Sequence, residues 1–579
     1  MSRKFTILPI ILGLLLPLFT FAQTRQKVSL LLLNGKVFTA DEKFTIAEAI
    51  AVDGEKIVAV GTSNELRAKY AAAKTIDLQG KLVTPGFNDA HVHFFRGALS
   101  LLTVSLFDSK TVEEAKLRVA AKVKETKAGE WIVGRGWDHT LWGNKFPTRQ
   151  DLDQIAPNNP VYLVRVDGHI GWANSAALKL AKLDKQTKNP EGGEIERDAS
   201  GEATGILKET AQGLVGGLVP QPTGEQQTKG MELALKMARE YGITSVQDNS
   251  GYETTKLYRE FLKQNKLTVR VAEWQDFEDS IEKLKQQRAE FASFKDDPSR
   301  LKLTALKGYV DGTLGSKTAA MLAPFSDDAG NSGIPRRSSE ELTKMIVERD
   351  AAGFQIALHA IGDKANRMVL DGFQSVNNVP PSARDFKQAV MTADGKIQIE
   401  RLSKESKRHR IEHAQVIAPA DFKRFAELGI LASMQPTHAI SDKRWADSRL
   451  GEYRVLGAYS WHLMKSYKVH VPFGTDFPVE AINPYATIYA AVSRQDAEGI
   501  PVGGWQPQEK LTIEEAIRCH TFESAYAEFA EREKGEIKVG MFADLIVHSK
   551  DLLTVEHREI LNTTPIYTIF NGRVIYEKK

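Results

Sequence analysis

The chain has 579 residues, of which 42% are hydrophobic and 26% charged, values close to globular averages that exclude wholesale disorder. Its 77 basic and 74 acidic residues leave a net charge of +3, too small for the basic surface of a nucleic-acid-binding protein. With Cys519 as the only cysteine, an intramolecular disulfide, a Cys-rich zinc site and an iron–sulfur cluster are excluded. Any metal must therefore be held by histidine, carboxylate or a less usual ligand.

The first 22 residues are predicted to be a secretory signal peptide. Arg3 and Lys4 precede an uncharged apolar run from Phe5 to Ala22 that ends in small residues, which is the layout of a cleavable signal. An uncleaved membrane anchor is the alternative, because the run is about long enough to span a bilayer. No later apolar stretch approaches the ~20 residues of a membrane span. We therefore expect a periplasmic or secreted mature protein without membrane insertion.

The two ends of the mature chain both have the pattern of short strands and tight turns. Near the beginning, Asn34-Gly35 and Asp53-Gly54 separate apolar runs, and such dipeptides are strong hairpin signals. Near the end, Asn571-Gly572 separates two further runs in the same way. The pattern predicts one small β-sandwich domain assembled from residues 24–82 and 535–579.

Between these ends, in residues 83–534, apolar strand-like runs alternate with helical stretches, as in βα units around parallel strands. There are eight such runs, the number of a closed (β/α)8 TIM-like barrel, but the region exceeds the ~250 residues that such a barrel needs. The surplus lies mainly in an insertion at about 111–228, which we predict to be a lid subdomain. A second, charged insertion at 391–409 is predicted to be a solvated excursion. The eight runs are Lys81 to Asp89, Gly242 to Gln247, Thr268 to Glu273, Leu303 to Val310, Gln355 to Leu358, Arg408 to Ile411, Gly429 to Met434 and Val469 to Phe473.

Metal-ligand residue types stand where these runs end. His91 and His93 follow the first run, and because residues i and i+2 of a strand share one face, both imidazoles can reach one ion. His359, His413 and Asp476 end later runs, at the barrel face where active sites of this architecture are built. Any one of them alone would more often be a core or loop residue, but five in barrel register predict a metal site. Such ligands suit Zn²⁺, with Mn²⁺, Fe²⁺ or Ni²⁺ as alternatives, and open coordination positions indicate catalysis.

Several longer motifs give these residues a family context. They include the Pro-Gly-Phe-Asn-Asp-Ala-His-Val-His segment at 85–93, Val-Asp-Gly-Thr-Leu-Gly-Ser at 310–316, Leu-His-Ala-Ile-Gly-Asp at 358–363, Ile-Glu-His at 411–413 and Gly-Thr-Asp at 474–476. Together they resemble the amidohydrolase superfamily, most closely the branch of metal-dependent hydrolases typified by N-substituted formamide deformylase. The resemblance covers nearly the whole mature chain.

The resemblance implies one further ligand. The fourth barrel strand of the family carries a lysine four residues before the aspartate of the Val-Asp-Gly motif, and here that residue is Lys307, before Asp311. Burial favours the neutral amine, which CO2 can convert into a carbamate that bridges two metal ions. One ion would lie on His91, His93 and Asp476, and the other on His359 and His413. An unmodified Lys307 with a single metal, or a lysine whose end reaches solvent, remain alternatives. Lys302, on the opposite face of the same strand, serves as a comparison.

These parts predict hydrolysis of a C–N bond in a linear or cyclic amide. A water held between two divalent cations loses its proton near neutral pH, and Asp476 can act as general base and then as general acid. Substrate contacts are expected from Trp137 and His169 in the insertion and from His438 after the seventh run. For the tryptophan, packing of the insertion is the alternative.

Two other functions stay open at this point. One is a single-metal deaminase-type enzyme with unmodified Lys307, and the other is a catalytically silent envelope binding protein that keeps the fold. The expected partner is a small amide-type molecule and neither nucleic acid nor a membrane, while a homodimer is left open.

Overall fold

The computed structural model describes residues 25–166, 168–377, 387–391, 397–401 and 407–579. The predicted signal peptide therefore lies outside the described residues. The centre of the molecule is a parallel sheet of seven strands, which backbone hydrogen bonds nearly close into a barrel. In sheet order the strands are β22 (Leu431–Ser433), β21 (Arg410–His413), β18 (Gln355–Ala360), β17 (Leu301–Tyr309), β16 (Arg270–Asp276), β15 (Ile243–Asp248) and β8 (Phe87–Val92). The predicted mixed α/β class with a parallel barrel is confirmed in this form.

The eighth predicted strand, 469–473, is an extended segment and not a regular strand. It nevertheless lies between the two edge strands, because the amide of Met434 donates to the carbonyl of Pro472 (3.0 Å) and that of Ala90 donates to the carbonyl of Phe473 (3.0 Å). The barrel is thus nearly closed by backbone hydrogen bonds along this segment.

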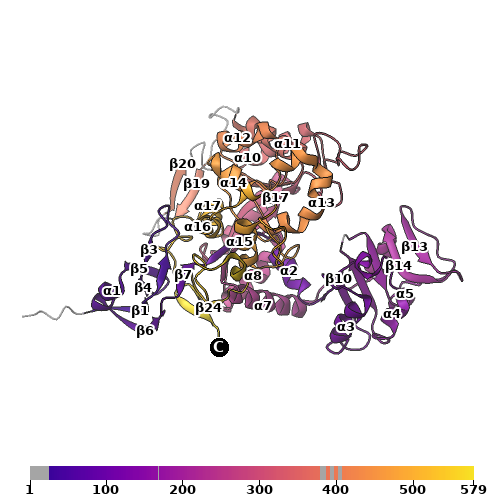
Figure 1. The fold of residues 1–579 in the computed structure, drawn as a ribbon, viewed down its shortest axis with the longest axis horizontal. Helices are drawn as coiled ribbons and strands as arrows, with labels where there is room; N and C mark the ends of the chain where they lie inside the picture. Colours follow the sequence, from indigo (N-terminus) through magenta and orange to yellow (C-terminus); the bar gives the residue numbers. More distant parts are fainter. Residues whose placement is uncertain (1–24, 167, 378–386, 392–396, 402–406) are drawn as a thin grey trace, which may run out of the picture.

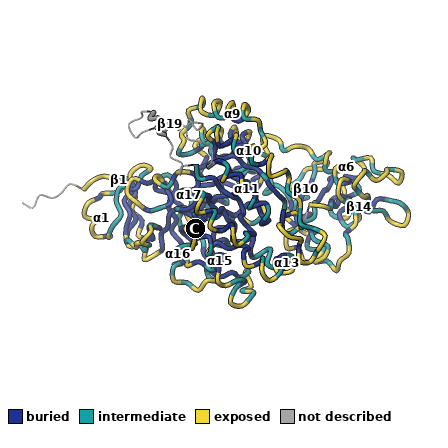
Figure 2. The backbone as a smooth tube through the Cα atoms, turned by 90° about the horizontal axis from the view of Figure 1, so that it is seen from above, coloured by how far each residue is buried: buried dark blue, intermediate teal, exposed yellow. Residues whose placement is uncertain are grey.

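Helices cover the outside of the barrel. Many begin at a side-chain cap that satisfies their first amide groups: Thr223 and Gln226 form a capping box on α7, and Ser280 caps α9. Among the described residues no helix has the length and apolar character needed to cross a bilayer. Figure 2 shows the buried backbone through the centre and exposed residues on outer helices such as α9. The helices around the barrel are α2 (Phe94–Ser100), α7 (Gly224–Glu240), α8 (Thr255–Lys263), α9 (Ile281–Ser293), α10 (Ser339–Ala351), α11 (Asp363–Asn377), α12 (Phe422–Leu428), α13 (Pro436–Arg454), α14 (Trp461–Ser466), α15 (Pro484–Ser493), α16 (Ile513–Cys519) and α17 (Phe522–Ala527).

The two ends of the chain form two further sheets whose apolar side chains share one buried cluster. Segments from both ends pair directly, since β23 near the C-terminus lies antiparallel to β7 near the N-terminus. A buried ion pair also joins these sheets to the barrel: the guanidinium of Arg270 donates to the carboxylate of Asp544 at 2.7 and 3.1 Å. The four-stranded sheet contains β5 (Lys56–Gly61), β4 (Ala49–Asp53), β1 (Gln26–Leu33) and β6 (Tyr70–Asp77), and the six-stranded sheet contains β25 (Arg573–Glu577), β24 (Pro565–Phe570), β23 (Leu545–His548), β7 (Leu82–Pro85), β2 (Lys36–Phe38) and β3 (Ile46–Ala47).

The predicted first barrel strand, 81–89, is in fact two strands of different sheets. Its first half is β7 of the six-stranded terminal sheet, and its second half begins β8 of the barrel. Gly86 separates the two halves, and a Cβ atom at this position would lie 2.1 Å from Oγ1 of Thr244. Because apolarity is the same on both sides of Gly86, the sequence pattern alone does not show the change of sheet.

The insertion forms a sheet and core of its own, drawn at the right of Figure 1. Its sheet begins before the predicted start at about 111, because it includes β9 (Val104–Ser105). The six strands lie in the order β13 (Gly193–Arg197), β14 (Ala203–Glu209), β12 (Ile170–Ala173), β11 (Val161–Arg165), β10 (Ile132–Trp137) and β9, with α3 (Val112–Val123), α4 (Arg149–Asp153), α5 (Ser175–Leu180) and α6 (Gly213–Gly216). Of the charged excursion at 391–409, the structure describes an antiparallel pair, β19 (Lys387–Met391) with β20 (Ile397–Arg401), while residues 392–396 and 402–406 lie outside the described residues.

Candidate metal centre

The barrel brings the predicted ligands together at one end. In the parallel register His359 of β18 lies beside Tyr309 of β17 and beside Glu412 of β21. The carboxyl ends of neighbouring parallel strands meet at the same edge, so residues at these ends share one site. None of the predicted ligands is more than 8% exposed; they are His91, His93, Lys307, His359, His413 and Asp476.

Three of these residues form the first donor group: His91, His93 and Asp476. Oδ1 of Asp476 lies 3.3 Å from Nε2 of His91 and 3.4 Å from Nε2 of His93. Ligand atoms about 2.0–2.2 Å from a tetrahedral Zn²⁺ ion are about 3.4 Å apart. The spacing of the first donor group therefore fits a divalent cation.

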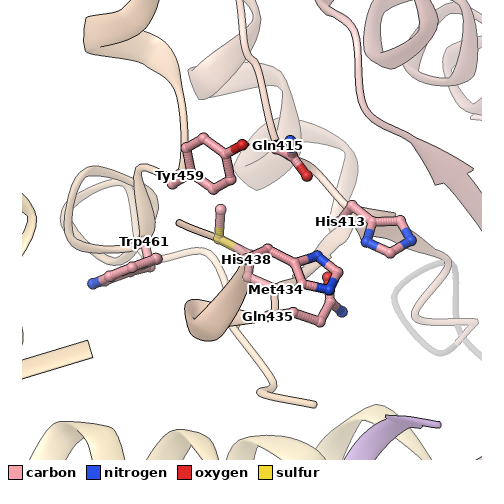
Figure 3. Close-up of a pocket in the computed structure, with 7 residues that line it drawn as sticks. All are labelled: His413, Gln415, Met434, Gln435, His438, Tyr459 and Trp461. Carbon is pink, nitrogen blue, oxygen red and sulfur yellow. Dashed lines mark hydrogen bonds between the residues drawn. The ribbon is translucent and has the colours of Figure 1, made fainter. Parts of the chain in front are cut away.

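A second donor group consists of His413, His438 and Asp476, so the aspartate is common to both. Nε2 of His438 lies 3.6 Å from Oδ2 of Asp476. The rings of His413 and His438 are stacked, with centroids 5.6 Å apart (Figure 3). Nδ1 of His413 and Nε2 of His438 are buried and make no hydrogen bond with the residues that the structure describes. Buried imidazole nitrogens without partners are costly unless they bind an ion, which makes this group fit a second cation.

His359 lies beside the second donor group, with its ring centroid 4.5 Å from that of His413. Its Nε2 donates to the carbonyl oxygen of Gly312 at 3.1 Å. This hydrogen bond leaves Nδ1 as the unprotonated nitrogen, the usual arrangement of a metal-binding histidine whose other nitrogen donates to a backbone carbonyl.

Lys307 is buried against the same cluster. Its Nζ lies 3.3 Å from Nε2 of His91, and no carboxylate of the described residues lies within ion-pair distance of it. Burial lowers the pKa of Lys307 to about 8. Lys302, on the same strand, is instead paired with Glu528 at 2.9 Å. Of these two lysines of one strand, Lys302 therefore has a carboxylate partner, whereas Lys307 has none among the described residues.

The other groups of the centre are in the protonation states that metal binding requires. Burial lowers the pKa of His359 to about 3 and holds that of His413 well below its usual value, so both imidazoles are neutral at pH 7. Burial alone would raise the pKa of Asp476, but its contacts with His91 and His93 outweigh burial and hold the pKa well below the usual value. Neutral imidazole and ionised carboxylate are the forms that bind a metal ion.

The backbone at two of these residues is in the left-handed region. His413 has φ 72° and Asp476 has φ 58°, a conformation that is uncommon outside glycine. It costs of order 1–3 kcal/mol and is found mainly at functional sites, where the surrounding fold enforces it. The sharp turn after each strand directs both side chains into the centre.

Arg410 and Glu412, which were not among the site residues predicted from the sequence, are buried beneath the first donor group and support it. Glu412 accepts a short hydrogen bond from Nδ1 of His91, and Nε of Arg410 donates to Glu412 at 2.5 Å. Burial raises the pKa of Glu412, but the charges of Arg410 and His91 lower it to about 2. The ionised carboxylate therefore keeps the proton of His91 on Nδ1 and leaves Nε2 for a cation. The alternation Arg410-Ile411-Glu412 in a strand was the available signal, since it places both charges on one face.

The substitution Glu412→Gln should weaken Zn²⁺ binding about 10- to 100-fold, because outer partners of metal-binding histidines have effects of this size. Competition with a chromophoric chelator at fixed pH measures the affinity. Glu528→Gln is the matched control: Glu528 is equally buried and ion-paired, but its partners are Lys302 and Lys534. Equal Zn²⁺ affinity in wild type and Glu412→Gln would contradict the role given to Glu412.

A cavity of about 1480 Å³ opens above the centre and is lined by both the barrel and the insertion. His169 and His438, predicted to contact substrate, are in its wall. Trp137 is not: it is fully buried in the core of the insertion, where its Nε1 donates to the carbonyl of Leu163 at 2.9 Å. Trp137 therefore packs inside the insertion, which was the alternative to a contact with substrate.

Comparison with known proteins gives this geometry a family context. The sequence profile of the Amidohydrolase family matches residues 74–576, and that of the Imidazolonepropionase-like composite domain of bacteria matches residues 49–73. The chain is 32% identical to Protein LONG AFTER FAR-RED 3 of Arabidopsis thaliana, over 94% of this chain and 91% of that protein. It is 28% identical to N-substituted formamide deformylase of Arthrobacter pascens, over 96% of this chain and 99% of that protein.

Among solved structures, an uncharacterized metal-dependent hydrolase from Pyrococcus horikoshii is similar, with a TM-score of 0.72 and 26% sequence identity. The match covers 91% of this chain and 99% of that one. The shared architecture therefore includes the barrel that carries the two donor groups.

Proposed function

The chain belongs to the amidohydrolase family, and on this premise we propose that it hydrolyses a carbon–nitrogen bond in a small linear or cyclic amide after export from the cytoplasm. Family membership and the similar structures support a metal-dependent hydrolase. The observation that carries the proposal is that two donor groups share Asp476 at the base of a large cavity. The apolar segment 1–22 supports export.

Two divalent cations, Zn²⁺ foremost, would be held by the imidazoles of the two donor groups, by His359 and by Asp476. When bound, such ions lower the pKa of a coordinated water and polarise a carbonyl oxygen. Lys307 would help to hold the ions as a carbamate, formed when its neutral amine adds to CO2 and releases a proton. The buried Lys307 has no carboxylate partner among the described residues, which supports this modification, because the carbamate would supply a negative charge to the cations.

The chain's own contribution to the reaction is proton transfer and orientation. Asp476 is ionised at neutral pH, so it can accept a proton from water as the water oxygen bonds to the carbonyl carbon. As the carbon–nitrogen bond breaks, Asp476 returns that proton to the leaving nitrogen. His169 lines the cavity, where it can donate to or accept from polar groups of the substrate. His438, which was also expected to contact the substrate, borders the same cavity but belongs to the second donor group.

We assign the insertion at about 111–228 the role of a lid, because its residues complete the wall of the cavity above the barrel. Residues 24–82 and 535–579 are assigned to a terminal β-sandwich, supported by the buried cluster that both terminal sheets share. In this division residues 83–534 form the catalytic barrel with its insertion.

Removal of metal tests the function. The mature chain stripped with a strong chelator is expected to lose at least about 100-fold in the rate of hydrolysis of N-acyl amines, N-acyl amino acids or cyclic ureides, because the ions supply both the activated water and the polarised carbonyl. Addition of Zn²⁺ or Mn²⁺ should restore the rate at two equivalents per chain, measured by elemental analysis. Equal rates before and after stripping would refute a metal-dependent mechanism.

A further inference from the structure

We propose that the substrate carries a negatively charged group, a carboxylate above all, and that Arg96 binds this group. The inference rests on the proposed function and narrows it to amides of anionic compounds, such as N-acyl amino acids. It is carried by an arginine that lines the cavity beside the metal centre without a partner of opposite charge.

Arg96 is placed close to the reacting atoms by its position in the chain. It is the third residue of α2, which begins directly after His93, and it lines the cavity together with His93, Lys307 and Tyr309. The guanidinium therefore belongs to the same cavity wall as residues of the metal centre.

Two other cations of the cavity wall already have carboxylate partners. Arg165 is paired with Asp138 at 2.7 Å, and Lys208 is paired with Glu194 and Glu196, both at 3.1 Å. Arg96, in contrast, makes no hydrogen bond or ion pair with any residue that the structure describes. It is exposed in the cavity wall, so its five N–H donors are available to a ligand.

An anionic group of the substrate would complement the charge of Arg96. If the neighbouring site held two divalent cations, a carboxylate between them and the guanidinium would be attracted by both. Tyr309 offers a second donor, because its ring lies 4.8 Å from Nζ of Lys307 and its hydroxyl has no hydrogen-bond partner among the described residues. A planar guanidinium and a hydroxyl together suit a carboxylate.

The test compares pairs of substrates that differ in one charge. N-formyl and N-acetyl amino acids are offered beside their neutral carboxamides, to the metal-loaded wild type and to Arg96→Gln. The wild type should prefer the acids in kcat/KM by about 10- to 100-fold, the usual effect of a charge-assisted hydrogen bond. Arg96→Gln should remove this preference by raising KM for the acids, with the carboxamides unchanged, and Arg96→Lys should keep part of it.

Arg444→Gln is the matched control. Arg444 is also exposed in the cavity wall, but its guanidinium lies 4.0 Å from the ring of Trp445, and its replacement should leave the preference for acids intact. The inference is overturned if the wild type hydrolyses acids and carboxamides equally, or if Arg96→Gln keeps the preference. If no compound of either kind is hydrolysed, the proposed function fails for these substrates. Calorimetry then measures how tightly the same compounds bind to the wild type and to Arg96→Gln. Tighter binding of the acids that disappears in Arg96→Gln would support its role, while equal or absent binding would overturn it.

Discussion

Replacement of Asp476 with asparagine is expected to lower kcat/KM of the metal-loaded protein by about 10³-fold, within the range for loss of a general acid–base residue. The carboxylate is the one member common to both donor groups, and it is also the proposed proton carrier. An amide can neither take the proton nor bridge two cations as an anion. Asparagine is chosen because it keeps the backbone conformation while removing the charge: Asp476 has φ 58°, which asparagine adopts more readily than most other side chains.

Steady-state kinetics and elemental analysis together measure this effect. Glu480→Gln is the control, since Glu480 is a carboxylate of the same cavity wall but belongs to neither donor group; its activity should stay within about threefold of wild type. Both variants should unfold at similar temperatures. Full activity of Asp476→Asn would show that another residue carries the proton, and full metal content with lost activity would limit Asp476 to proton transfer.

Replacement of Lys307 with methionine is expected to remove about one metal equivalent per chain and to lower kcat/KM about 10²- to 10³-fold. Methionine has nearly the length of lysine and suits the buried position, but it cannot form the carbamate that would hold two cations together. Growth or exchange with carbon-13-labelled bicarbonate should give a carbamate resonance in the wild type and none in the variant.

Lys302→Met separates this effect from a general loss of stability. Lys302 lies on the same strand but is paired with Glu528, so its replacement should lower the melting temperature and leave the metal content unchanged. The single-metal, deaminase-type alternative predicts a different result: Lys307→Met would then retain its one metal equivalent and its full activity.

The local sequence was sufficient to predict which side chains gather at the end of the barrel. His91, His359 and His413 each end an apolar run, and strand geometry places the ends of parallel strands together. This conclusion follows from the two-residue period of a strand, which can be read without knowledge of any contact. The same period predicted opposite faces for Lys302 and Lys307, which are five positions apart, but β17 shifts register against β16 between Leu303 and Leu306. The regular alternation is therefore interrupted between the two lysines, and the sequence pattern does not show this shift.

Other features depended on contacts between distant segments, which no local pattern contains. The change of sheet at Gly86 is decided by β23, more than 450 residues away in the chain. His438 faces Asp476 and His413 because of how α13 begins after β22, and Glu412 supports His91 across 321 positions.

The sequence by itself thus determined the kinds of ligand, the strand ends that carry them and the parallel α/β architecture. The tertiary structure decided how those ligands divide around Asp476, that Trp137 packs in a core and that Arg96 has no carboxylate partner among the described residues. The physical reason is that periodicity fixes the face on which a side chain lies, whereas its partner depends on the packing of the entire chain.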